Sequence, residues 1–528
     1  MIDLASRLML FVRDFTGRGA DSFYWFQNGQ LQETDAASVV GFAGIVVWHD
    51  FWMIRDALFD KTGTLPGTIV DVDELHISIS GVPEDRLSRE KHDVTTRLGQ
   101  YGAEQEVCVT YQKMFNKGVA FDVDIAAKAA AAIAAMYLDL CTKAFADGEL
   151  ERFFTIEVPA YRVLQLSMSA GISIDAAGLS EKRSQAEHDY FLLLKDYSAK
   201  HDMPLETPSR RAIEAKLLLE GFELDEVSVE YLLEFVPHDR DFGGDTMALL
   251  DLDTARRVLG SLTLTSNGTR PVVDVFGSRT SRVQLRSPSL QNIPKRFRSI
   301  ISAHDGARLS YVDFDQFEVG IMAALSGDEE LKRLYADGDM YDLFANTHLG
   351  LVGNRKAAKQ LFLSYAYGMS RKALVDAAFS LGVDRQKAKE AFRLFQRYED
   401  WKKSVWAEFQ RTGRVATVFG NHYRRSGGGQ LTGKEQRSAV SQVVQGTASL
   451  IFKRALLAVA SIGDVRLVLP MHDALLFEHT LAETPAKVVE AFEGVMTDVL
   501  SSLVTGKASI SDFAEREQTF SAPGSSEP

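Results

Sequence analysis

The sequence predicts an α+β multidomain protein in which a smaller α/β unit precedes a larger unit that mixes strands and helices. Its 528 residues suffice for two to four structural units, and a hydrophobic content of 45% allows a large buried core. Within the first 150 residues, strand-like runs precede an alanine-rich helical stretch. In the remainder, short apolar runs at 309–312 and 465–477 are separated by long helical patterns.

The first unit is expected to end near residue 150. Its alanine-rich helix covers about 125–145, because alanine has the highest helix propensity. Helical patterns continue from about 176 to 259, and the small polar residues of 521–528 are expected to form a disordered tail. The strand-like runs of the first unit lie at 8–12, 44–48 and 68–72.

Composition excludes several classes of protein. No run of eighteen or more apolar residues occurs, so neither a membrane span nor a membrane partner is expected. Cys108 and Cys141, the two cysteines, fit a reducing compartment without a disulfide framework. The net charge of −13 is a whole-molecule sum, whereas nucleic-acid binding needs only a local basic track. Basic clusters at 295–298, 355–359 and 423–425 could form such a track or be ordinary solvated surface.

The stretch 309–328 is expected to join a strand to a helix, with acidic residues at the junction. Residues 309–312 favour a strand, and an apolar stripe further on favours a helix. Asp315 and Glu318 have the spacing of a capping box, which would make Asp315 the helix N-cap. Asp313 ends the apolar strand, where a buried carboxylate needs a salt bridge, a hydrogen-bond network or a metal ion.

A hairpin is predicted near the C-terminus. The apolar runs 465–469 and 475–477 flank a turn that carries His472 and Asp473 at its tip. Such a pair is often an ordinary surface turn.

Between the two aspartates, a predicted helix places Arg355, Lys359 and Tyr367 along one slowly turning face. Two carboxylates that can hold cations, opposite a helix that offers Arg and Lys, form the geometry needed to bind a triphosphate.

These stretches together resemble the family A DNA polymerases, the family of bacterial DNA polymerase I and many phage enzymes. The family's first motif is similar to DYSQIELRIMAHLSGD, and residues 313–328 are DFDQFEVGIMAALSGD. The second, R-x-x-x-K-x-x-x-[FY]-x-x-x-YG, is matched from Arg355 to Gly368 except at Leu363. The third, VHDE, corresponds to 471–474. LQNIP at 290–294 and QGTA at 445–448 also match, so five motifs occur in the family's order.

The resemblance implies a right-hand polymerase with palm, fingers and thumb, preceded by an exonuclease-like α/β domain. The expected divisions are an exonuclease-like domain at 1–150 and a polymerase domain at 151–520, with the thumb at about 176–270, the palm at about 271–327 and 416–520, and the fingers at about 328–415.

In many family members the first domain is a proofreading 3′–5′ exonuclease, which needs carboxylates for two metals. Here Thr16 stands after Asp14 where the family pattern has glutamate, and Ile54 stands after Asp50 where it has aspartate. The third acidic position is taken by Asp122 or Asp124. An exonuclease-like fold without activity is therefore expected, and an unrelated structural domain is the alternative.

The resemblance also implies the reaction, which is template-directed transfer of deoxynucleotides to a primer 3′ end by two Mg²⁺ ions. Primer–template DNA and dNTPs are the implied partners, and the implied location is the cytoplasm of a bacterial cell or phage-infected host. The motifs say nothing of a processivity factor. The implied metal ligands are Asp313, Asp473 and the main-chain carbonyl of Phe314, with Lys359 as a further catalytic residue. The implied nucleotide contacts are Arg355, Lys359, Glu318 as steric gate, Gln316, Tyr367, Leu363 and Tyr341. The implied DNA contacts are Arg282, Asn292, Arg437, Gln445 and His472.

Three positions depart from the family pattern. Ala474 replaces an accessory carboxylate, so reduced but real activity is expected. Gly320 replaces an arginine, and Leu363 replaces the aromatic ring that faces the incoming sugar. Two other functions stay open. Glu318 and the QGTA stretch argue against a single-subunit RNA polymerase, and the presence of Asp313 with the other charged motif residues argues against an inactive DNA-binding scaffold.

Overall fold

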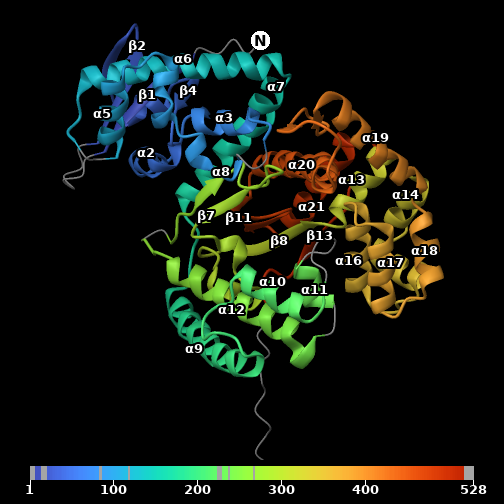
Figure 1. The fold of residues 1–528 in the computed structure, drawn as a ribbon. Coiled ribbons are helices and arrows are strands. Elements are labelled where there is room, and N and C mark those ends of the chain that lie inside the picture. Colours follow the sequence, from blue (N-terminus) through green and yellow to red (C-terminus); the bar gives the residue numbers. More distant parts are fainter. Residues whose placement is uncertain are drawn as a thin grey trace, which may run out of the picture.

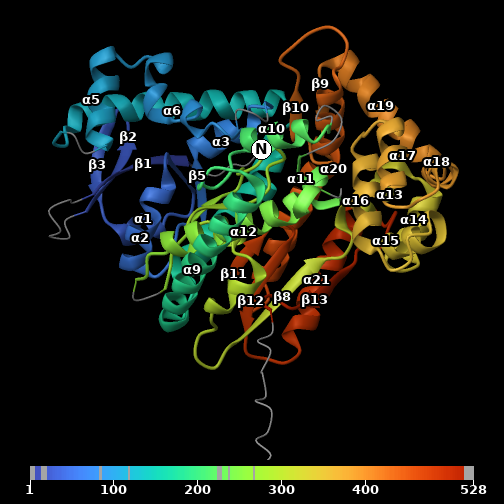
Figure 2. The same cartoon turned by 60° about the horizontal axis from the view of Figure 1, so that its bottom comes forward.

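The computed structural model describes residues 6–13, 21–82, 86–116, 119–222, 229–235, 238–265 and 268–515. An N-terminal unit, coloured blue to cyan in Figure 1, lies beside a larger assembly of helices around a central sheet. The end-on view in Figure 2 shows the helices α14–α18 at the edge of the molecule opposite this unit.

The N-terminal unit is built on a mixed five-stranded sheet in the order β3-β2-β1-β4-β5. β1, β4 and β5 are parallel, β2 is antiparallel to β1, and the long helix α6 packs on the sheet. Its strands are β1 (Ser6–Val12), β2 (Ser22–Gln27), β3 (Gln30–Thr34), β4 (Ile45–Trp48) and β5 (Thr68–Asp71). Its helices are α1 (Ala36–Val40), α2 (Arg55–Thr62), α3 (Val72–Ile79), α5 (Gln105–Phe115) and α6 (Val123–Ala146).

The predicted strands at 8–12, 44–48 and 68–72 and the predicted helix at 125–145 are confirmed. The β2–β3 hairpin was missed. Its signals are an aromatic run followed by Asn28-Gly29, and both of these residues have positive φ, as the two-residue turn of a hairpin requires.

The central sheet is antiparallel, in the order β11-β12-β8-β13. The predicted strand at 309–312 and the predicted hairpin at 465–477 are both confirmed in it. α20 begins with a capping box between Thr432 and Glu435, and α21 packs against both α20 and the sheet. Its elements are β8 (Arg308–Phe314), α13 (Phe317–Ser326), α20 (Gly433–Ala460), β11 (Arg466–Met471), β12 (Ala474–His479), α21 (Thr484–Val499) and β13 (Ala508–Ser511).

Two groups of helices flank the central sheet, as the helical patterns predicted (Figure 1). α7 (Leu150–Arg152) and α8 (Val158–Ala170) follow the N-terminal unit, and α8 contacts both that unit and α20. The first group consists of α9 (Ala176–His201), α10 (Arg210–Leu219), α11 (Val229–Phe235) and α12 (Phe242–Ser261). The second consists of α14 (Glu329–Ala336), α15 (Met340–Leu343), α16 (Arg355–Ala366), α17 (Arg371–Ser380), α18 (Arg385–Arg393) and α19 (Gln396–Thr412). Two small hairpins complete the fold, β6 (Val272–Asp274) with β7 (Gln284–Ser287) and β9 (Arg414–Ala416) with β10 (His422–Arg424).

Among the described residues, α6 and α20 are long and apolar enough to cross a membrane by length and composition alone. Both pack against other elements of the protein instead. α6 covers the N-terminal sheet, and α20 contacts α13, α19 and α21. α20 also carries Lys453, which is fully buried and pairs with Glu157. Core helices therefore account for both apolar stretches.

The ion pair of Glu478 with Arg466 joins β11 to β12 and predicts a pH-dependent stability. Burial acts to raise the pKa of Glu478, but hydrogen bonds from Arg466 and His304 outweigh it and lower the pKa to about 2. Its stabilising effect is present in full above the unfolded value of 4.5 and is lost as pH falls towards 2. We expect Glu478→Gln to lower the free energy of unfolding by about 2 kcal/mol near neutral pH.

Urea unfolding measures this loss, which should shrink as pH is lowered from about 5 to about 3. Glu483→Gln is the matched control, because that side chain is 58% exposed and only weakly paired with Lys487. A loss for Glu478→Gln that stays constant over this pH range would contradict the assignment.

Candidate active site

Asp313 and Asp473 come together at one end of the central sheet. Ala474, the first residue of β12, lies opposite Asp313 of β8, so Asp473 in the preceding turn is next to the end of β8. His472 in this turn has a φ of 57°, which the tight two-residue turn requires. Both aspartates face a cavity of about 420 Å³, which is lined by Asp313, Phe314, Asp315, Gln316, Phe317, Glu318, Tyr341, Arg355, Lys359, Leu363 and Asp473.

The two carboxylates repel one another in a site from which water is partly excluded. Burial, and then the charges of Asp473 and Asp315, raise the pKa of Asp313 to about 6, and Lys359 acts in the opposite direction. Burial also raises the pKa of Asp473, against the lowering effect of Arg282. Within the described chain, Oδ1 of Asp473 is buried and has no hydrogen-bond partner. A positive charge between the two carboxylates would therefore stabilise their ionised forms.

The predicted capping box at Asp315 is wrong. The helix α13 begins at Phe317, and its N-cap is Gln316, whose φ of 52° is left-handed. The Asp315 carboxylate instead accepts a hydrogen bond from Ser509 Oγ at 2.8 Å. Since Glu318 is bonded to side chains from other elements, it is not available to cap the helix. Asp315 thus lies in the cavity as a neighbour of Asp313 and does not start the helix.

Glu318 is a meeting point for three side chains that are distant in the sequence. Its Oε1 accepts from Arg282 Nη2 at 2.5 Å and from Gln445 Nε2 at 3.2 Å, and its Oε2 accepts from the Tyr367 hydroxyl. Arg282 also lies 3.7 Å from Asp473 Oδ2. The predicted nucleotide contacts Glu318 and Tyr367 and the predicted DNA contacts Arg282 and Gln445 are therefore one connected network.

The cationic face of α16 lines the opposite side of the cavity, as its spacing predicted. Arg355 and Lys359 lie over the ring of Tyr341, at 5.3 and 5.7 Å from its centroid. Arg355 donates from Nε and Nη2 to Asp339 Oδ2, at 2.9 and 2.7 Å. The other oxygen of Asp339 accepts from the N–H groups of Tyr341 and Asp342, the second and third residues of α15. Asp339 was not among the predicted site residues, although its position before a helix marked it as a possible N-cap.

Gln316 connects the end of β8 to this cationic face. Its Nε2 donates to the Gly338 carbonyl at 3.0 Å, and its Oε1 accepts from the Met340 N–H at 2.7 Å. These two bonds hold the segment that contains Asp339, which in turn holds Arg355. Gln316 lies in the cavity as predicted, but both ends of its amide are occupied by this segment.

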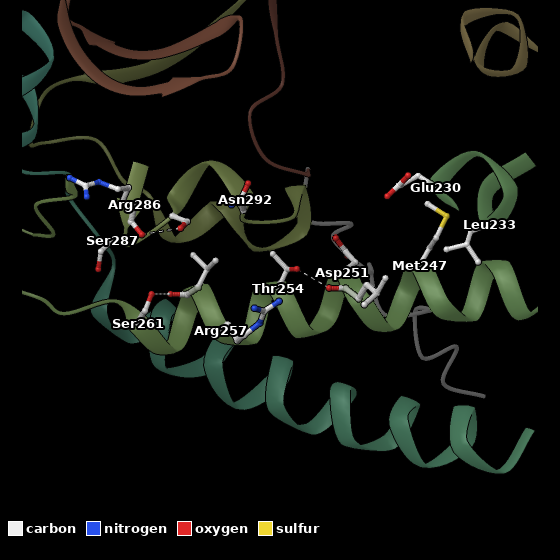
Figure 3. Close-up of a pocket in the computed structure, with 13 residues that line it drawn as sticks. Glu230, Leu233, Met247, Asp251, Thr254, Arg257, Ser261, Arg286, Ser287 and Asn292 are labelled. Atoms are coloured by element: carbon white, nitrogen blue, oxygen red, sulfur yellow. Dashed lines mark hydrogen bonds between the residues drawn. The ribbon is translucent and has the colours of Figure 1, made fainter. Parts of the chain in front are cut away.

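Of the predicted DNA contacts, Arg437, Gln445 and Asn292 line two further hollows, whereas His472 lies in the turn between β11 and β12. Arg437, Ser441 and Gln445 share one face of α20 and line a cavity of about 250 Å³ together with Tyr367. Asn292 lies in a larger groove of about 770 Å³ between α11, α12 and the segment after β7. Figure 3 shows Asn292 and Arg286 on one side of this groove, with Thr254 and Arg257 of α12 on the other.

The departures from the family pattern have structural counterparts. A Cβ on Gly320 would lie 2.5 Å from Met496 Cε and 2.9 Å from the Tyr335 ring, so a larger side chain does not fit without rearrangement. Ala474 is buried on β12. Leu363 is half-buried and lines the cavity one turn beyond Lys359.

The N-terminal unit contains its own acidic cluster. The side chains of His49, Asp50 and Asp73 lie close enough together to bind one metal ion. Asp73 accepts from the Asp50 N–H at 2.9 Å, and Asp71 caps α3. Neither Asp71 nor Asp73 was among the predicted residues, although Asp71 lies within the strand-like run at 68–72 and Asp73 directly follows it.

Of the predicted exonuclease residues, Ile54 is buried and apolar, and Asp122 caps the N-terminus of α6 with Asp124 in its first turn. Asp14 and Thr16 lie outside the described residues.

The known proteins that this chain is similar to are DNA polymerases. Residues 261–510 match the model of DNA polymerase family A. DNA polymerase I of Chloroflexus aurantiacus is 31% identical over 256 residues, which are 43% of this chain and 26% of that protein. DNA polymerase I of Mycobacterium tuberculosis is 28% identical over 389 residues, 63% of this chain and 41% of that protein. DNA polymerase theta of Caenorhabditis elegans is 29% identical over 238 residues, 43% of this chain and 15% of that protein.

A solved structure, the POL domain of Pol1 from M. smegmatis in complex with DNA primer-template and dNTP, has the same fold. It superposes with a TM-score of 0.70 at 19% identity, covering 93% of this chain and 91% of that one. The chain spans less than half the length of the curated relatives it matches.

The central sheet with its flanking helices and paired carboxylates therefore defines a right-hand polymerase fold. Residues 261–510 match DNA polymerase family A, and the chain shares the fold of the solved POL domain.

Proposed function

We propose that this chain is a template-directed DNA polymerase, which adds deoxynucleotides to a primer 3′ end and releases pyrophosphate. One observation carries the proposal: Asp313 and Asp473 share a single cavity with Arg355 and Lys359. The relatives named above are DNA polymerases, and the solved one was bound to DNA primer-template and dNTP. The bacterial relatives support the cytoplasm of a bacterial cell as the place of action.

The donor set fits two Mg²⁺ ions, held by the carboxylates of Asp313 and Asp473 and the carbonyl of Phe314. Oxygen atoms are the ligands that Mg²⁺ prefers. The buried Oδ1 of Asp473 has no partner among the described residues, and the pKa values of both aspartates are raised. Both features favour binding of a cation by these carboxylates. Bound ions would lower the pKa of the primer hydroxyl and neutralise charge on the leaving group.

The remaining roles follow from the positions of the side chains. Arg355 and Lys359 hold the triphosphate, and Lys359 Nζ supplies a proton to the departing pyrophosphate. Arg355 keeps its two bonds to Asp339, made by Nε and Nη2, while Nη1 donates to phosphate. The carboxylate of Glu318 fills the space that a ribose 2′-hydroxyl would need.

The primer–template duplex is proposed to lie along the groove of Figure 3, between α12 and Asn292. Arg282 reaches the primer end through the minor groove, where hydrogen-bond acceptors occupy similar places in every correct base pair. Tyr367, Arg437 and Gln445 bound a separate cavity, where the template base is expected.

Extension of a labelled primer tests the proposal and separates it from its rivals. The expected result is Mg²⁺-dependent, template-directed extension with dNTPs and little extension with ribonucleotides. Preferential use of ribonucleotides would favour a single-subunit RNA polymerase. DNA binding without extension by either set would favour an inactive scaffold.

The connection through Gln316 predicts a defect in nucleotide binding. In Gln316→Ala, Asp339 and Arg355 lose their fixed position relative to Asp313, because two hydrogen bonds to the 338–340 segment are gone. We expect the KM for dNTP to rise roughly tenfold, with the affinity for primer–template unchanged. Asp339→Asn, which retains an oxygen for the α15 cap, should raise KM similarly.

The double variant is the check, since effects transmitted through one segment are not additive. Its KM should be lower than the product of the single effects predicts. Independent, multiplicative effects would show that Gln316 does not act through Asp339.

We also propose that the protein lacks proofreading. Ile54 cannot bind a metal and is buried in the apolar core of its unit. Incubation of a 3′-labelled single strand with Mg²⁺ and no dNTP should leave it intact. Degradation that disappears in Asp50→Ala would show that the cluster of His49, Asp50 and Asp73 is an active nuclease site.

A further inference from the structure

Residues of α17 and α18 line a basic pocket. These two helices lie at the outer edge of the second helical group (Figures 1 and 2). It has a volume of about 400 Å³ and a floor formed by buried Leu374, Val375 and Phe392. Its remaining lining residues are charged: Arg371, Lys372, Asp376, Arg385, Lys389 and Arg393. The whole chain has a net charge of −13, so this concentration of cations is local.

Most of these cations are not neutralised by the protein. Among the described residues, the one ion pair in the pocket joins Arg385 to Asp376. The nearby carboxylate of Asp384 accepts the backbone N–H groups of Gln386 and Lys387, and Glu390 accepts from the Gln386 amide. The structure gives no ion pair for the four other cations of the described lining, which are Arg371, Lys372, Lys389 and Arg393.

An aromatic side chain stands beside the cations. Phe379, near the end of α17, is 54% exposed, and the Arg385 guanidinium lies 4.4 Å from its ring centroid. A cationic groove next to an exposed aromatic ring is the arrangement that binds single-stranded nucleic acid, with phosphates on the cations and a base on the ring.

The pocket is also close to the expected template path. Tyr367, which bounds the cavity with Arg437 and Gln445, is four residues before Arg371. Four residues span at most about 14 Å of extended chain. A template strand leaving that cavity would therefore meet the α17–α18 pocket within a short distance.

We infer that the α17–α18 pocket binds single-stranded DNA, namely the unpaired template ahead of the primer end. The identity of the strand rests on the proposed polymerase function, whereas the binding of single-stranded DNA does not. The phosphates contact Arg371, Lys389 and Arg393, and one base stacks on Phe379.

Binding of fluorescent DNA tests the inference. The probes are oligothymidine and two primer–templates, one with a long oligothymidine 5′ overhang and one with a single-nucleotide overhang. The triple variant Arg371→Ala/Lys389→Ala/Arg393→Ala should lose affinity for oligothymidine and the long overhang at least tenfold, and little for the short overhang. Its log–log salt dependence on the long overhang should become shallower by about 2, as expected for three lost phosphate contacts. Phe379→Ala should weaken the same two probes about tenfold.

The matched control removes three exposed cations elsewhere, Lys113→Ala/Lys128→Ala/Lys195→Ala, and should leave all three affinities unchanged. Equal loss on long and short overhangs, or no loss on oligothymidine, would overturn the inference. If the triple variant lost affinity for oligoglutamate but kept its affinity for DNA, the inference would be overturned in favour of an acidic peptide. Failure of the polymerase proposal would show separately, as absent primer extension with oligothymidine binding intact.

Discussion

Asp313→Ala and Asp473→Ala are each expected to abolish primer extension, lowering kcat by about 10³-fold or more. Both carboxylates end neighbouring strands of the central sheet and face the cavity that contains Arg355 and Lys359. Removing either one would leave the proposed cation site with a single side-chain ligand and would take away charge stabilisation worth several kcal/mol. Rapid-quench measurement of single-nucleotide addition checks this, with circular dichroism to show that the variants fold.

Asp315→Ala is the matched control, because Asp315 faces the same cavity but is bonded to Ser509. Its charge is one of the causes of the raised pKa of Asp313, so its removal should lower the pKa of Asp313 towards the ordinary value. A loss of activity within about tenfold is expected. Equal losses in Asp315→Ala and Asp313→Ala, with folding intact, would mean that the metal ligand has been misassigned.

Residues of the cavity could be predicted from the sequence when a local pattern marks them. Asp313 and Asp473 are recognisable because each interrupts or ends an apolar strand, and Arg355 and Lys359 because their spacing matches the helical repeat. The pairing of β8 with β12, which brings the two aspartates together, required only that the strands be found.

The prediction from the sequence was wrong for the capping box, because the side chain of Glu318 bonds to partners that are distant in the sequence. The spacing of Asp315 and Glu318 is that of a capping box, but Arg282, Tyr367 and Gln445 bond to Glu318 from elements far away in the chain. A charged donor offers a carboxylate a stronger bond than a backbone amide at a solvated helix end does. Local spacing carries no information about such a competitor.

Asp339 shows the same limit in a milder form. Its role as N-cap of α15 could be foreseen from its position, whereas the bond of its second oxygen to Arg355 depends on how α15 packs against α16. The bonds of the Gln316 amide to the 338–340 backbone were likewise not foreseen from the sequence. Loop-to-helix contacts of this kind depend on tertiary packing, which single-sequence patterns do not specify.

The wild-type enzyme is expected to discriminate strongly against dideoxynucleotides, and Leu363→Tyr is expected to reduce this preference. The resemblance to family A polymerases implies that a tyrosine here can supply a hydroxyl in place of the missing 3′-hydroxyl of the substrate. Leu363 lines the cavity one turn from Lys359 and has neither a hydroxyl nor a ring. The 3′-hydroxyl of a normal substrate therefore remains an important contact.

Losing one hydrogen bond to a charged group costs roughly 1.5–3 kcal/mol, which corresponds to about ten- to a hundredfold in selection. Competitive incorporation of dTTP against dideoxy-TTP measures the ratio. Leu363→Phe is the matched control, because it adds the ring without the hydroxyl and should retain the wild-type preference. Near-equal use of both nucleotides by the wild type would mean that Leu363 does not face the sugar. The same preference in Leu363→Tyr and Leu363→Phe would mean that the new hydroxyl does not reach the place left by the 3′-hydroxyl.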